Sequence, residues 1–164
     1  MNNFKERLEE MLVERNISKN QLSKIIGVRP DTIYGYYRKG LMPEIHIAKR
    51  ISEYFNCSLD YLFGLSEKVN NDDKNHLTFS ETIKKLIKDN GKSVENTMKE
   101  LNISDRTYYR WQSGESKPLT SMIILLAKYF DVSIDYLVAE YLKWILNSLK
   151  KDLISSLFVV FINL

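Results

Sequence analysis

The sequence predicts an all-α protein made of two tandem domains of five short helices each, followed by an apolar helix at the C-terminus. Three observations lead to this prediction. The chain of 164 residues repeats itself at a constant offset of 75 residues. Within each copy, apolar residues recur at helical intervals. Polar residues that favour helix N-termini stand before several of these segments. The length suits one ordinary domain or two small ones.

The repeat needs no gap over about 60 residues, which predicts two domains of one fold. It is clearest at the end of each copy, where "SLDYL" at residues 58–62 aligns with "SIDYL" at residues 133–137. Further aligned pairs are Phe4 and Phe79, Thr32 and Thr107, Tyr34 and Tyr109, and Pro43 and Pro118. We expect the domains to cover residues 4–64 and 79–141. Residues 65–78 are polar and rich in Asn and Asp, which is typical of a linker.

Helix boundaries can be assigned from capping residues. Ser18 with Gln21, and Thr78 with Glu81, have the spacing of a capping box. Ser104 can cap the third helix of the second copy. In the first copy, Pro30 suits the first turn of the equivalent helix. Ser58 and Ser133 can cap the short fifth helices.

A tight turn is expected between the second and third helix of each copy. Gly27 and the aligned Asn102 stand there, and these are the two residue types that best tolerate left-handed backbone. Two capped helices joined by such a turn form a helix-turn-helix. We expect this motif at residues 18–37 and 93–112.

Both copies resemble the lambda-repressor-like family of DNA-binding domains, of the Cro and xenobiotic-response-element type. The first copy carries Ser-x-x-x-Leu-Ser and Ile-Gly-Val within residues 18–28. The second carries Ser-x-x-Thr-Tyr-Tyr-Arg-Trp-x-x-Gly-x-x-Lys-Pro over residues 104–118, and each copy ends on Asp-Tyr-Leu. The resemblance covers residues 4–64 and 79–141. It implies a DNA-binding transcriptional regulator of bacterial or phage type that reads the major groove with its third helix.

The third helix of the second copy has a suitable reading face. Arg106, Tyr109 and Arg110 share one outward stripe, while Tyr108 and Trp111 point to the core. Arginine can donate two hydrogen bonds to guanine, which discriminates bases by roughly 1–3 kcal/mol. Taken alone, such a stripe is typical of a solvated helix. Within the five-helix pattern we expect DNA contacts from Ser104, Asp105, Arg106, Thr107, Tyr109, Arg110 and Lys117.

The first copy has a weaker reading face. Gly35 aligns with Arg110 and offers no side chain, and Asp31 aligns with Arg106 and repels phosphates. Residues 4–64 nevertheless hold 10 basic and 8 acidic side chains, against 9 and 9 in residues 79–141. We expect DNA contacts from Lys19, Arg29, Asp31, Thr32, Tyr34 and Arg38. The second domain is expected to read sequence more than the first.

Other classes of function have little support. The single cysteine, Cys57, excludes an intrachain disulfide and is expected in the core. His46 and His76 are far apart in sequence, so no metal site is expected. There is no Gly-rich phosphate loop and no catalytic constellation, so we expect no enzyme and no cofactor. The N-terminal residues are too acidic for a signal peptide, and a cytoplasmic protein is expected.

Residues 142–164 lie outside the repeat. Leucines and a valine recur there every three or four residues, as in one helical seam. We expect this helix to form a homodimer, with packing on the second domain and membrane contact as alternatives. Its last apolar run, residues 153–164, is about 18 Å long as a helix, which is too short to span a bilayer of about 30 Å.

The sequence therefore predicts a sequence-specific transcriptional regulator that binds double-stranded DNA. A flexible linker of about 15 residues has a span near 21 Å, and half-sites one turn apart are about 34 Å from each other. A stretched linker lets one chain reach two half-sites. The alternative is an interaction protein whose first domain no longer reads DNA and instead binds a partner or a second copy.

Overall fold

Helices form all the regular secondary structure in the part of the chain that the structure, a computed structural model, describes: residues 3–69 and 75–139. This confirms the all-α prediction. The first domain contains α1 (Asn3–Glu14), α2 (Lys19–Ile25), α3 (Pro30–Arg38), α4 (Ile45–Phe55) and α5 (Leu59–Leu62). The second contains α6 (Phe79–Asp89), α7 (Val94–Glu100), α8 (Asp105–Gln112) and α9 (Thr120–Phe130), and residues 134–139 are also helical. The apolar segment 142–164 lies outside the described residues.

The expected capping residues begin the helices. Ser18 and Gln21 form a capping box at α2, and Thr78 and Glu81 form one at α6. The side chain of Ser104 accepts a hydrogen bond from the backbone of Thr107 at the start of α8. These bonds satisfy amide groups that have no partner within the helix. Local side-chain bonds thus begin α2, α6 and α8, whereas α3 begins at Pro30 without a side-chain bond from Arg29.

The turns between α2 and α3 and between α7 and α8 have the predicted geometry. Gly27 has a φ of +68° and Asn102 a φ of +54°. The amide after each turn residue donates back into the preceding helix, from Val28 to the Ser23 carbonyl and from Ile103 to the Met98 carbonyl. Both copies therefore make the same turn, although only one of them uses glycine.

Aromatic pairs at equivalent positions hold the third helix of each domain on the first. Phe4 packs edge-to-face on Tyr36 with ring centroids 5.5 Å apart, and Phe79 packs likewise on Trp111 at 6.1 Å. Such pairs contribute about 0.5–1.5 kcal/mol beyond their buried area. Met98 of α7 is completely buried, at the position where the first domain has the smaller Ser23. The third helices of the two domains, α3 and α8, are therefore anchored on their inner faces.

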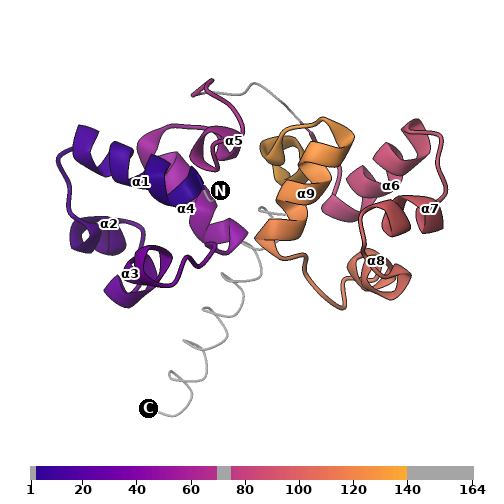
Figure 1. The fold of residues 1–164 in the computed structure, drawn as a ribbon, viewed down its shortest axis with the longest axis horizontal. Coiled ribbons are helices and arrows are strands. Elements are labelled where there is room, and N and C mark those ends of the chain that lie inside the picture. The colour runs from indigo at the N-terminus through magenta and orange to yellow at the C-terminus, as the bar shows by residue number, and fades with distance from the viewer. Residues whose placement is uncertain (1–2, 70–74, 140–164) are drawn as a thin grey trace, which may run out of the picture.

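The two domains pack directly against each other (Figure 1). Their buried apolar residues form one continuous cluster. Helices α4, α5 and α9 lie toward the middle of the molecule, and α2 and α7 lie toward its two ends (Figure 1). Asn75, at the end of the linker, is buried and donates to Thr82 Oγ1 and to the Tyr136 carbonyl, each at 2.8 Å. Direct packing, rather than the linker alone, sets how the domains are placed.

Candidate nucleic-acid interface

Helix α8 exposes the face that the sequence predicts. Arg106, Tyr109 and Arg110 are exposed, and the Tyr109 side chain stands out with 54% of its surface accessible. Tyr108 and Trp111 are buried on the opposite side. Because Ser104 caps the helix by its side chain, the first turn is held in place, and this turn is the part of a recognition helix that meets base edges.

The two arginines of α8 are in different electrostatic situations. Arg110 Nε lies 3.0 Å from Glu115 Oε1, in the segment after the helix. For Arg106, no ion pair exists among the described residues. Both guanidinium groups are solvent-accessible, so the Arg110 pair is only weakly stabilising. Arg106 is free to donate to a base or phosphate, whereas Arg110 must first leave Glu115.

The other predicted residues of the second domain surround this face. Asp105 is exposed in the first turn of α8, where a carboxylate is favoured by the helix dipole. Thr107 is half-buried, with its hydroxyl 2.8 Å from that of Ser104. Lys117 is exposed in the segment between α8 and α9. Asp105 and Arg106 thus lie at the N-terminal end of α8, Arg110 lies in its last turn, and Lys117 follows the helix.

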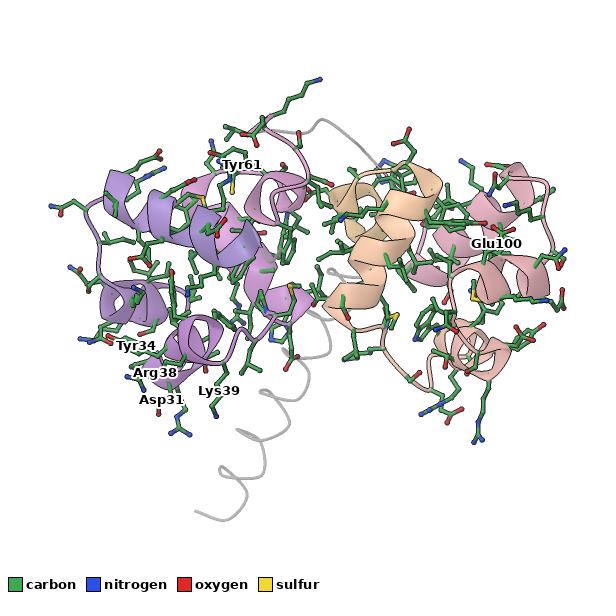
Figure 2. The ribbon with its side chains drawn as sticks, viewed as in Figure 1. Asp31, Tyr34, Arg38, Lys39, Tyr61 and Glu100 are labelled. Atoms are coloured by element: carbon green, nitrogen blue, oxygen red, sulfur yellow. The ribbon has the colours of Figure 1, made fainter. Side chains whose placement is uncertain are left out.

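Helix α3 presents a face with its own internal contacts. Asp31, Tyr34, Arg38 and Lys39 lie together at the lower edge of the first domain (Figure 2). The Arg38 guanidinium lies over the Tyr34 ring, 5.2 Å from its centroid. Arg29 Nη2 and Asp31 Oδ2 are 3.6 Å apart, and both side chains are more than 80% exposed. Thr32, one residue along, is half-buried.

Gly35 explains why the first face lacks a central side chain. Its backbone has ordinary helical geometry, so glycine is not required by conformation. A Cβ atom placed on Gly35 would lie 3.3 Å from Leu41 Cδ1. Leu41 is half-exposed, and it covers the place where the second domain has Arg110. The sequence shows the missing side chain, but it does not show that an apolar neighbour covers the site.

Lys19 is the most constrained of the predicted basic residues. Its ammonium lies 2.8 Å from Glu9 Oε2 and 4.1 Å from the Tyr37 ring centroid. The hydrogen bond from Lys19 holds the pKa of Glu9 below its usual value. A phosphate contact by Lys19 therefore competes with an existing ion pair.

Two further properties of the described residues bear on function. No group of His, Cys, Asp or Glu within residues 3–69 and 75–139 could hold a metal ion. In the same ranges, no helix is long and apolar enough to cross a membrane. The predicted core position of Cys57 is confirmed: its thiol is buried, and this raises its pKa to about 11.

Comparison with known families identifies the fold. The helix-turn-helix family model matches residues 8–62 and again residues 83–137. The chain belongs to the helix-turn-helix family. The two matches confirm the resemblance to lambda-repressor-like domains of the Cro type, and family membership implies DNA as the binding partner. No curated protein and no solved structure matches the chain. Which helix-turn-helix residues touch DNA, and where each domain ends, stay predictions.

Proposed function

We propose that this helix-turn-helix protein is a sequence-specific transcriptional regulator, in which α8 reads bases in the major groove and α3 contributes mainly backbone contacts. The observation that carries the proposal is the exposed face of α8. There, Arg106 is exposed and unpaired, next to Tyr109 and Arg110. A major groove admits such a helix, and arginine is the residue best suited to guanine. Binding at an operator would block or recruit polymerase in the cytoplasm of a bacterium.

Selection from a pool of random DNA duplexes tests this function. The full chain should enrich a defined sequence motif. Arg106→Ala should weaken binding to the selected duplex by roughly 1–3 kcal/mol, or about 5- to 150-fold, because a base-reading arginine is lost. Lys88→Ala is the matched control, because it removes one positive charge from the last turn of α6, outside the predicted contacts. No enriched motif, or equal losses in the two variants, would contradict the proposal.

A second candidate is an interaction protein whose first domain has lost base reading. It is favoured by the face of α3, where Gly35 offers no side chain and Asp31 is paired with Arg29. Combined Arg29→Ala and Asp31→Ala substitutions separate the candidates. If the enriched motif and the affinity are unchanged, the first domain does not read DNA. If bases at one end of the motif change, it does.

A further inference from the structure

Two carboxylates at equivalent positions of the repeat, the buried Asp60 and the partly buried Asp135, join the domains. Asp60 Oδ2 accepts a hydrogen bond from the Ile134 amide at 2.9 Å, at the start of the last described helix of the second domain. Asp135 Oδ2 accepts one from the Leu59 amide at 2.7 Å, at the start of α5. Asp135 is Asp60 shifted by the 75-residue offset of the repeat, and Ile134 is likewise Leu59 shifted. The two hydrogen bonds are therefore reciprocal: in each, an Asp of one domain accepts from the equivalent amide of the other domain.

A second set of equivalent residues meets where α4 and α9 begin. A cavity of about 500 Å³ is lined by residues 42–46 and 117–121, and the second range is the first shifted by 75 residues. Thr120 Oγ1 donates to the Pro43 carbonyl across this junction at 2.8 Å. The interface thus brings equivalent residues together at two separate places.

Reciprocal contacts of this kind define a two-fold relation between the domains. When one surface pairs with its own equivalent, residue i contacts j and j contacts i, as in a symmetric dimer. A head-to-tail arrangement would instead bring different surfaces together. The relation is approximate, because Lys49 adds an ion pair to Asp135 at 3.3 Å and its equivalent position holds Ile124.

The same two-fold relation applies to the recognition helices. Helices α3 and α8 lie at the same edge of the molecule, on either side of α4 and α9 (Figure 1). Two recognition helices related by a two-fold axis meet a duplex in opposite senses, so that their half-sites are inverted. Their reading faces differ, since Asp31 and Gly35 stand where α8 has Arg106 and Arg110. The half-sites must then differ in sequence.

We propose that a single chain acts as an internal pseudo-dimer that binds one DNA duplex through two unlike half-sites in inverted orientation and at a fixed spacing. The Asp60 and Asp135 contacts set that spacing. A second copy of the chain is not needed to complete the DNA-binding surface. This proposal rests on the proposed function, because it presumes that α3 and α8 face DNA.

The first test measures stoichiometry and site geometry with the full chain and a duplex enriched by selection. We expect one chain per duplex in sedimentation velocity, and an enriched motif with two inverted, unlike halves. Inserting five base pairs between the halves turns one of them to the opposite side of the duplex, since a turn is about 10.5 base pairs. This should weaken binding about 100-fold, because the two domains can no longer bind their half-sites at the same time.

Other outcomes overturn the proposal in ways that can be told apart. Two chains per duplex, directly repeated halves, or indifference to the insertion would overturn the pseudo-dimer and leave sequence-specific binding intact. Failure to enrich any duplex would overturn the proposed function as well.

The second test addresses the interface. The combined Asp60→Ala and Asp135→Ala substitutions should let the two domains reorient. The loss of affinity caused by the five-base-pair insertion should then fall from about 100-fold to less than about tenfold. Combined Glu14→Ala and Asp89→Ala substitutions are the matched control. These two acids are exposed, occupy equivalent positions at the ends of α1 and α6, and carry the same total charge. An insertion penalty that stays at the wild-type value in the Asp60 and Asp135 variant would overturn the role of the interface.

Discussion

Arg110 Nε lies 3.0 Å from Glu115 Oε1, so one of the two arginines that we expect to read bases is already paired with a carboxylate. Both side chains are accessible to water, and an exposed ion pair of this kind contributes about 0–1 kcal/mol. We therefore expect the pair to affect DNA binding more than it stabilises the fold. Glu115 also places a negative charge near the expected path of the phosphates.

Glu115→Gln should strengthen binding to the selected duplex by about two- to fivefold, because Arg110 no longer has to break an exposed ion pair before it binds DNA. The gain should shrink as salt is raised, because the removed charge acts through solvent. Fluorescence anisotropy at two salt concentrations measures both effects. Asp89→Asn, at the exposed end of α6, removes the same charge outside the predicted interface and should leave the affinity unchanged. Weaker binding by Glu115→Gln would show that Glu115 instead positions Arg110 for DNA.

Two glycines of the first motif should respond oppositely to alanine. Gly35→Ala should raise the free energy of unfolding by up to about 1 kcal/mol, because alanine is the better helix former and the half-exposed Leu41 side chain can move away. Gly27→Ala should lower it by about 1 kcal/mol or more, because its φ of +68° is strained for alanine. Urea denaturation of both variants checks the prediction. A loss of stability in Gly35→Ala would mean that Leu41 is held rigidly in place.

Cys57 should be almost inert in the folded protein. Burial raises the pKa of its thiol to about 11, so little of the reactive thiolate exists at pH 8. Alkylation by iodoacetamide at pH 8, followed by mass spectrometry, should be much slower in the native chain than in the same chain in urea. Equal rates would show that the region after α4 opens readily in solution.

The fold could be predicted from the sequence for two reasons. The repeat is visible in the sequence itself, and the capping residues bond to residues close to them in the chain. Ser18, Thr78 and Ser104 each bond to an amide three residues away, and Gly27 marks its turn through its own backbone. Such interactions depend on sequence spacing alone. The same holds for the exposed stripe of α8, whose members share a face because of helical periodicity.

Contacts between distant residues could not be predicted in this way. Asp60 and Asp135 stand two residues after the predicted caps Ser58 and Ser133, and each bonds to the backbone of the other domain. The recurrence of an Asp at the same position of both copies could have pointed to a shared role. Sequence spacing does not, however, show which residues of the other domain each Asp contacts. The contact of Leu41 with Gly35 likewise depends on how the chain after α3 folds back.

Asp60 should make the stability of the protein depend on pH. Burial raises the pKa of its carboxyl from 3.8 to about 6, against the opposing effect of the Ile134 hydrogen bond, and the charge of Asp135 adds to the increase. The folded state thus binds a proton more tightly than the unfolded state. Between pH 4 and 6 the free energy of unfolding should therefore fall as pH rises, by up to about 3 kcal/mol from this group.

Asp60→Asn tests this dependence, because an amide oxygen can still accept from Ile134 but carries no charge to desolvate. Urea denaturation at pH 4, 5, 6 and 7.5 should show the variant matching the wild type at pH 4 and exceeding it at pH 7.5. Asp89→Asn, at an exposed position, should follow the wild-type curve throughout. If Asp60→Asn instead loses stability at pH 7.5, the ionised carboxylate favours the interface. In that case, the hydrogen bond to Ile134 outweighs the cost of burying the charge.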